Sequence, residues 1–222
     1  MVQYSFYPRG SVKIFPEVTL ILIVLNIVLF FLFSILFKVG LSIDYVAIKP
    51  SNILKGDYLW TFFTSMFMHG NFIHLFVNMF SLLFIGNLVE RIIGRVRYIS
   101  FYLLSGFVAS FIFVLFSLIP FPIFSSDFDQ FAVGASGALF GLIGLLMLLT
   151  PNLPVFIMFI PIPIKMKYAG PSILVFLWLV SILSDLPIGN TAHFGGLLAG
   201  IVYGIYLRKR YRRKVEYLRR IF

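Results

Sequence analysis

Two stretches rich in small residues decide how this chain folds: GASGALFGLIG at residues 134–144 and HFGGLLAGIVYG at residues 193–204. Both contain glycines four residues apart, which places them on one face of a helix. These are Gly137 and Gly141 in the first stretch and Gly196, Gly200 and Gly204 in the second. Small residues let two helix backbones approach closely inside a membrane. We therefore expect these two helices to pack against each other.

The whole chain has the composition of a membrane protein. Of its 222 residues, 60% are apolar and only 12% are charged, and the mean hydropathy is +1.02. About a quarter of the residues of a soluble domain are charged, and a soluble domain of this size cannot bury so much apolar surface. These values exclude a soluble globular domain, a disordered chain and a disulfide-rich scaffold. The sequence contains no Cys, which excludes disulfides, thiolate metal sites and a cysteine nucleophile.

Six apolar segments are long enough to cross a bilayer, which takes about 20 residues. They are residues 18–37, 69–89, 98–119, 132–150, 169–183 and 191–207. The apolar stretch 151–164 contains four prolines, so we expect a loop at the membrane surface there. The first segment starts too far along the chain, and is too long, for the hydrophobic region of a cleaved signal peptide.

The distribution of basic residues predicts the orientation. If both termini lie inside, the internal segments hold 15 Lys and Arg residues and the external loops hold three, in agreement with the positive-inside rule. We expect an all-α membrane protein, a bundle of six transmembrane helices with the N-in/C-in orientation. Residues 1–207 form the membrane domain. Residues 208–222 form a basic cytoplasmic tail facing anionic lipid, and no other feature indicates a nucleic-acid partner.

Polar residues collect at one expected depth in the membrane. His69 and His74 begin the second segment, and Asn78 follows one turn after His74. Ser136 lies about one turn into the fourth segment, and His193 opens the sixth. Polar groups at membrane depth usually face a bundle interior or a water-filled cavity. If the glycine stripes meet, Ser136 and His193 can come within hydrogen-bond distance, the minimum for a serine nucleophile with a histidine base.

Each of these residues also has a structural explanation. Serine on a small-residue face usually packs, histidine at a helix start often caps or lies at the interface, and Asn78 can bond to another helix. Other catalytic classes lack their motifs. The sequence has no His-Glu-x-x-His, no Gly-x-Ser-x-Gly elbow, no phosphate-binding loop and no pair of aspartates within the expected spans.

Three motifs resemble the rhomboid family of intramembrane serine proteases. Gly134-Ala135-Ser136-Gly137 is similar to the family's Gly-x-Ser-Gly. The run from Ala192 to Gly196, with Gly200, is similar to its Ala-His-x-x-Gly-x-x-x-Gly. Residues 68–78 are similar to its second-helix element with His and Asn, and Glu90-Arg91 also resembles the family pattern. One departure is Trp60-Thr61, where the family often has Trp-Arg.

The resemblance implies a rhomboid-like six-helix core in the cell membrane, with an active site that opens to the extracytoplasmic side. It implies hydrolysis, through an acyl-enzyme, of a peptide bond in or near the transmembrane segment of membrane-protein substrates. Ser136 would be the nucleophile and His193 the general base. His74, Asn78 and the Ser136 N–H would hold the oxyanion. The residues expected to pack around the site are Phe140, Gly134, Gly137, Gly196 and Gly200.

The resemblance implies neither a cofactor nor a metal, and two alternatives remain. A proteolytically silent relative that binds transmembrane clients would usually lack the Ser or the His, and both are present. A transporter or channel would favour two similar halves and broken helices, and the sequence shows neither.

Overall fold

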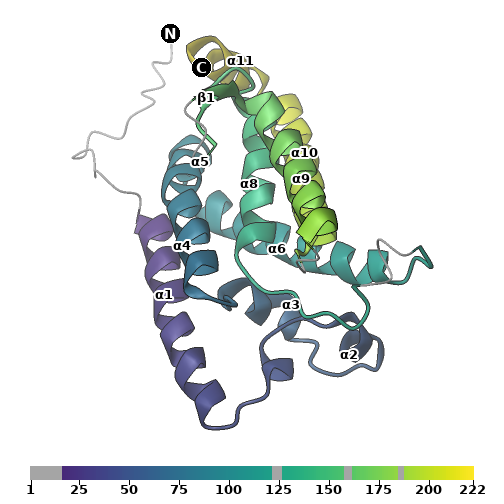
Figure 1. The fold of residues 1–222 in the computed structure, drawn as a ribbon. Helices are drawn as coiled ribbons and strands as arrows, with labels where there is room; N and C mark the ends of the chain where they lie inside the picture. The colour runs from purple at the N-terminus through teal and green to yellow at the C-terminus, as the bar shows by residue number, and fades with distance from the viewer. Residues whose placement is uncertain (1–16, 122–126, 158–161, 185–187) are drawn as a thin grey trace.

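The computed structural model describes residues 17–121, 127–157, 162–184 and 188–222. Helices run between two ends of the molecule, one carrying α11 and β1 and the other α2 and α3 (Figure 1). The long helical segments are α1 (Glu17–Lys38), α4 (Phe72–Ser81) continued by the π-helix η3 (Leu82–Gly86) and α5 (Asn87–Ile93), α6 (Arg95–Ser117), α8 (Ser136–Leu149), α9 (Met166–Ser184) and α10 (Asn190–Arg210). The short elements are η1 (Ile43–Tyr45), α2 (Pro50–Leu54), α3 (Thr61–Thr64), η2 (Ser65–Phe67), β1 (Pro154–Val155), β2 (Ile164–Lys165) and α11 (Arg212–Ile221).

Four of the six expected spans are long and apolar enough to cross a membrane by themselves. They are Glu17–Lys38, Phe72–Ile93, Arg95–Ser117 and Met166–Ser184. The other two are α8, which has only 14 residues and is therefore about 21 Å long, and α10, which starts with polar residues and ends with Arg208–Arg210. Helix α8 is buried in the interior of the bundle. Helix α10 packs one face against α6 and α8, while Leu198, Val202 and Tyr206 on its other face are exposed.

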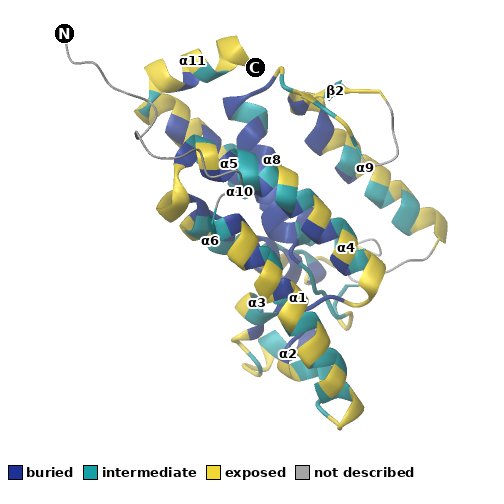
Figure 2. Cartoon of the chain, turned by 90° about the vertical axis from the view of Figure 1, so that its left-hand side faces the viewer, coloured by how far each residue is buried: buried dark blue, intermediate teal, exposed yellow. Residues whose placement is uncertain are grey.

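Helix α8 forms the centre of the bundle, packed against α6, α9 and α10. All its residues from Gly137 to Leu146 are buried, and Figure 2 shows the buried residues gathered around it. The expected contact between the two glycine stripes is confirmed. A Cβ added at Gly196 would collide with the carbonyl oxygen of Gly137, and one at Gly200 with that of Gly141. The two backbones touch, and any larger side chain would separate them.

Two helix starts differ from the sequence expectation. Helix α8 begins at Ser136 itself, because Gly134 has a φ of +116°, which is incompatible with a right-handed helix. Helix α4 begins at Phe72, because the side chain of Asn71 accepts a hydrogen bond from the His74 N–H at 2.8 Å and caps the helix. His69 therefore lies in the segment before the helix.

The basic residues at the end of the chain are helical. Helix α10 continues through Arg210, and residues 212–221 form α11. The proline-rich stretch contains no helix among its described residues, and its ends pair as the antiparallel strands β1 and β2. We call the end of the molecule that carries α11 the basic end, and the end where α8 and α10 begin the site end.

Glu90 fastens α1 to α5 at the basic end. Its buried carboxylate accepts hydrogen bonds from the Val18 N–H at 3.2 Å, the Thr19 N–H at 2.8 Å and the Thr19 hydroxyl at 2.8 Å. Acceptors at a helix N-terminus satisfy N–H groups that have no partner within the helix, and their negative charge opposes the helix dipole. This contact fixes the basic end of α1 against the core.

Candidate active site

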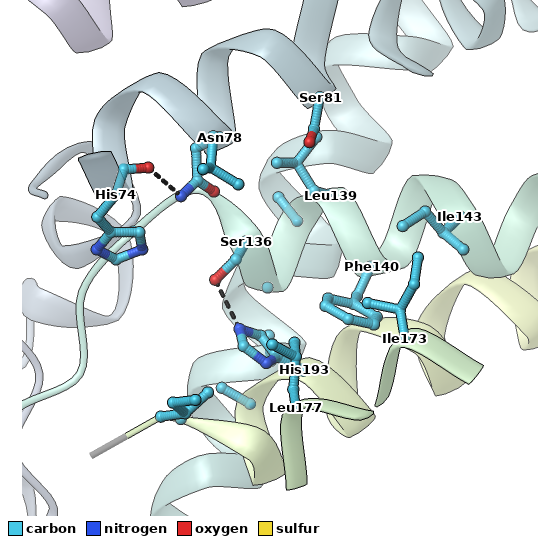
Figure 3. Close-up of a pocket in the computed structure, with 18 of the residues that line it drawn as sticks. His74, Asn78, Ser81, Ser136, Leu139, Phe140, Ile143, Ile173, Leu177 and His193 are labelled. Atoms are coloured by element: carbon cyan, nitrogen blue, oxygen red, sulfur yellow. Dashed lines mark hydrogen bonds between the residues drawn. The ribbon is translucent and has the colours of Figure 1, made fainter. Parts of the chain in front are cut away.

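Ser136 and His193 lie side by side at the site end. Ser136 is the first residue of α8, and His193 lies in the first turn of α10. The Ser136 Oγ and the His193 Nε2 are 2.8 Å apart, a hydrogen bond between residues 57 positions apart in the sequence (Figure 3). The glycine contacts of α8 and α10 hold the two helices at the separation that this bond needs. The approach predicted from the sequence is confirmed.

The imidazole of His193 is held by stacking. Its ring and that of Phe140 have centroids 4.7 Å apart and planes 20° apart. Among the described residues, no group hydrogen-bonds to the His193 Nδ1. The carboxylate of Asp127 lies near the start of α10, but it accepts a hydrogen bond from the Thr191 hydroxyl at 3.1 Å. The described chain thus contains a Ser–His pair without a third acidic member.

His74 and Asn78 approach the same cavity from α4. Figure 3 shows both on the side of Ser136 opposite to His193. The Asn78 Nδ2 donates a hydrogen bond to the backbone oxygen of His74 at 2.8 Å. The second N–H of that amide and the ring of His74 remain to serve a ligand. Within the described chain, the buried Asn78 Oδ1 has no hydrogen-bond partner.

Gly134 makes room for His74. A Cβ at position 134 would lie 2.8 Å from the His74 Nε2 and 3.8 Å from the Ser136 Oγ. The Gly134 N–H donates to the Ser65 oxygen at 2.8 Å, which ties the turn before α8 to η2. Glycine is required here for its positive φ and for the space beside the imidazole.

The pair opens into a cavity of about 1170 Å³. The polar groups Ser136, His193, His74 and Asn78 line one part of it. Most of the other lining residues are apolar, and those from α4, η3, α8 and α9 include Phe80, Phe84, Leu139, Ile143, Ile173, Phe176 and Leu177. Phe84 is 60% exposed and Phe176 is 62% exposed, so these walls also form part of the outer surface. The cavity can accommodate an extended apolar segment beside the Ser–His pair.

Several supporting contacts were not found by sequence reasoning. The Asp127–Thr191 hydrogen bond fixes the start of α10. His69, one of the polar residues singled out in the sequence, lies against His74 with ring centroids 5.2 Å apart. A pattern in the sequence signals only one such residue: Asn71, three residues before His74, is a typical helix N-cap. The others arise from contacts between distant segments, which no local pattern predicts.

The site has the groups needed for nucleophilic acyl transfer. A serine hydroxyl needs a base within hydrogen-bond reach, and the amide and imidazole groups nearby can donate to a developing oxyanion. The described residues contain no group of three or more His, Cys, Asp or Glu that could hold a metal ion.

The fold and the site define a multi-pass membrane protein with a serine and a histidine paired in its interior. The rhomboid domain profile matches residues 56–210, and the chain belongs to the rhomboid family. It is 33% identical over 168 residues to RHOMBOID-like protein 6, mitochondrial, of Arabidopsis thaliana, a match covering 72% of this chain and 48% of that protein. It is 31% identical over 196 residues to Rhomboid protease GluP of Bacillus subtilis, covering 83% of this chain and 34% of that one.

A third relative is the putative rhomboid protease YdcA of Bacillus subtilis, 31% identical over 134 residues, which cover 60% of this chain and 62% of that protein. The matched segments span about half or less of the length of the first two relatives. The chain therefore matches only a part of each of these two proteins.

Proposed function

We propose that this protein is a rhomboid-type serine endopeptidase that cleaves membrane-protein substrates in or near a transmembrane segment. The observation that carries the proposal is the 2.8 Å contact between the Ser136 Oγ and the His193 Nε2 at the wall of a cavity lined mostly by apolar side chains. Membership in a family that includes two Bacillus subtilis proteins named as rhomboid proteases supports it.

In the first step, Ser136 attacks the scissile carbonyl carbon while His193 accepts the hydroxyl proton at Nε2. The resulting tetrahedral intermediate carries its charge on the former carbonyl oxygen. It collapses to an acyl-enzyme when His193 returns the proton to the leaving amine. Water then attacks the ester with His193 again as the base, and Ser136 is regenerated.

The oxyanion needs donors that are fixed before the reaction. We assign this role to the Asn78 amide, the His74 ring and the Ser136 N–H. The Ser136 N–H lies in the first turn of α8, where N–H groups have no acceptor within the helix and the helix dipole favours negative charge. The hydrogen bond from Asn78 to the His74 oxygen supports this assignment, because it fixes the amide plane.

In this proposal the pair acts without an acidic third member from the described residues. Stacking against Phe140 orients the His193 ring, a task that a carboxylate performs in the serine protease triad. Burial of this ring also keeps bulk water from competing for its hydrogen bond with Ser136. We assign the positions of Gly134, Gly137, Gly196 and Gly200 to the packing that maintains this geometry.

The site end faces the extracytoplasmic side in this proposal, and both termini lie inside at the cell membrane. The excess of basic residues in the segments near α11 supports that orientation. Residues 1–207 then act as the membrane domain, and residues 208–222 act as a cytoplasmic extension. The substrate unwinds locally in the cavity, because an intact helix hides its peptide bonds.

A fluorophosphonate probe tests the proposal directly, because it labels an activated serine. We expect labelling at Ser136 in the purified protein and none in Ser136→Ala. The same preparations should cleave a transmembrane substrate in liposomes, whereas Ser136→Ala and His193→Ala should each lose about 10⁴- to 10⁶-fold in turnover. Because the two residues act as a unit, the double variant should be no worse than either single one.

A folded protein without labelling and without cleavage would contradict the proposal and favour a client-binding role. Thermal midpoints of the two variants serve as the control. Both substitutions leave the glycine contacts between α8 and α10 intact, so the midpoints should stay near that of the unmodified protein.

A further inference from the structure

The basic end holds a second cavity that the proposed proteolysis does not use. Its volume is about 390 Å³, and it lies between the last turns of α10 and the face of α11. Helix α10 contributes Ile205, Arg208 and Lys209, and α11 contributes Arg212, Val215, Glu216 and Arg219. The spacing in each set places its members on one face of its helix. The two helices therefore present matching faces to a single space.

Helix α11 is held in position to form this cavity. The Tyr211 between the helices has a non-helical backbone, with φ −125° and ψ 41°, and this lets the chain turn. Arg97 donates a hydrogen bond to the Tyr211 hydroxyl at 2.9 Å and also lies over the Tyr211 ring at 5.0 Å. Val215 is only 5% exposed. These contacts fasten α11 to the bundle, so its basic residues have defined places.

The charges of the cavity favour an anion. Among the described residues that line it, Glu216 is the single carboxylate. Arg212 donates a hydrogen bond to Glu216 at 2.9 Å, and this bond holds the pKa of Glu216 below its ordinary value. Within the described chain, Arg208, Lys209 and Arg219 form no ion pair with a carboxylate. Three basic groups thus face one space without an internal counter-charge.

The cavity is polar at one end and apolar at the other. Ile205 lies one helical turn closer to the bundle centre than Arg208 and Lys209, and it is 43% exposed. A phospholipid has the same polarity, with its acyl chains in the membrane and its phosphate at the surface. A free phosphate ion would use only the basic part. Basic groups at the rim of a bundle bind anionic head groups in this way.

We infer that the faces of α10 and α11 around Arg208, Lys209 and Arg219 form a binding site for the phosphate group of one anionic phospholipid, whose acyl chain lies beside Ile205. The site is independent of the Ser–His pair, which lies at the opposite end of α8 and α10. A lipid bound there bridges the two helices and secures α11 to the membrane surface.

The test compares two adjacent arginines of α11. Arg219 lines the cavity and Arg220 does not, so Arg219→Gln and Arg220→Gln lose the same charge in the same turn. Native mass spectrometry of the full chain in a neutral detergent, titrated with dioleoyl-phosphatidylglycerol, measures the fraction that carries one lipid. A basic residue near a membrane surface contributes about 1 kcal/mol to anionic lipid binding, so Arg219→Gln should weaken binding about fivefold. Arg220→Gln should change it less than twofold.

Two double variants should show a larger difference in lipid affinity. Arg208→Gln with Arg219→Gln should weaken binding about 25-fold if the two contributions add, whereas Arg213→Gln with Arg220→Gln should leave it nearly unchanged. All these side chains are exposed, so unchanged thermal midpoints are the folding control. Equal losses in the two pairs would overturn the inference, because diffuse attraction to a basic helix depends on charge alone.

Two further binding experiments identify the class of ligand. Dioleoyl-phosphatidylcholine should bind more weakly than phosphatidylglycerol, because its choline cancels the phosphate charge. Inorganic phosphate at the same concentration should fail to displace the lipid, because it lacks the acyl chain that contacts Ile205. Equal binding of the two lipids, or displacement by phosphate, would overturn the assignment to an anionic phospholipid.

Discussion

The contact between α8 and α10 and the cavity wall formed by α4, η3 and α9 are built in opposite ways. Glycine backbones touch at the first, where added Cβ atoms at Gly196 and Gly200 would strike carbonyl oxygens. Large rings such as Phe84 and Phe176, which are mostly exposed, line the second. Two backbones in contact cannot adjust, whereas exposed rings can change rotamer. The Ser–His pair therefore lies at the rigid contact between α8 and α10, and the space for a substrate lies against the adaptable wall of aromatic rings.

This difference predicts that a larger side chain in the contact between α8 and α10 causes a large loss of cleavage activity. Gly196→Val would force a branched side chain against the Gly137 oxygen and separate the helices that carry Ser136 and His193. A misplacement of about 1 Å costs about 100-fold in rate, and we expect at least that loss. The thermal midpoint should fall too, since overpacking costs about 1–3 kcal/mol.

Leu198→Val is the matched control for this substitution. It places the same side chain in α10 but on an exposed position. A Gly196→Val protein with normal cleavage and a normal midpoint would show that the glycine stripe is not the contact that positions the pair.

Asn78→Ala tests whether the Asn78 side chain stabilises the transition state or only packs against its neighbours. If the amide stabilises the oxyanion, turnover should fall on the order of 100-fold with little change in the Michaelis constant, because the interaction exists only in the transition state. Labelling of Ser136 should become slower but persist. Steady-state kinetics and thermal midpoints are measured on the same preparation. Early melting with a normal turnover would assign Asn78 to packing alone.

The adaptable wall should respond with smaller effects. Phe84→Ala removes a ring between the cavity and the outer surface, and we expect cleavage of a transmembrane substrate to rise several-fold because less side chain must move. The control is Phe76→Ala, because Phe76 belongs to the same continuous helical segment but does not line the cavity. This substitution should leave cleavage unchanged. Parallel progress curves measure both. Equal responses of the two variants would show that the substrate does not enter through the cavity wall formed by α4, η3 and α9.

The smallest expected effect concerns Asp127 and Thr191, whose hydrogen bond lies at the start of α10. Burial raises the pKa of Asp127 above its ordinary value, while the hydrogen bond from Thr191 partly offsets this shift. The folded state then holds this proton more tightly than the unfolded state. Asp127 therefore lowers the free energy of unfolding at neutral pH, and this penalty disappears as the pH falls through the raised pKa towards the ordinary one.

Asp127→Asn should remove this pH dependence, so that the thermal midpoint changes less with pH in the weakly acidic range. The exposed residue Asp57 provides the control substitution Asp57→Asn, which should retain the slope. The measurement is the thermal midpoint of each variant at several pH values across that range. If the slope of the midpoint against pH is unchanged in Asp127→Asn, Asp127 is not the source of the pH dependence.

The sequence by itself determined the class of protein and the pairing of its central helices. Apolar composition requires a lipid environment, and glycines four residues apart require a close neighbour. Together these patterns placed Ser136 and His193 near each other, because each residue lies beside its own stripe. Such conclusions need only the helical repeat, which is a local property of the chain.

The tertiary structure decided what depends on contacts between distant segments. It placed Ser136 at the first position of α8, bonded Asp127 to Thr191 and folded α11 back against α10. It also buried α8 in the centre of the bundle, and four segments of the described chain have the length and hydropathy to cross a membrane. Helix periodicity predicts which face is buried, but the neighbours of that face follow from the packing of the whole chain.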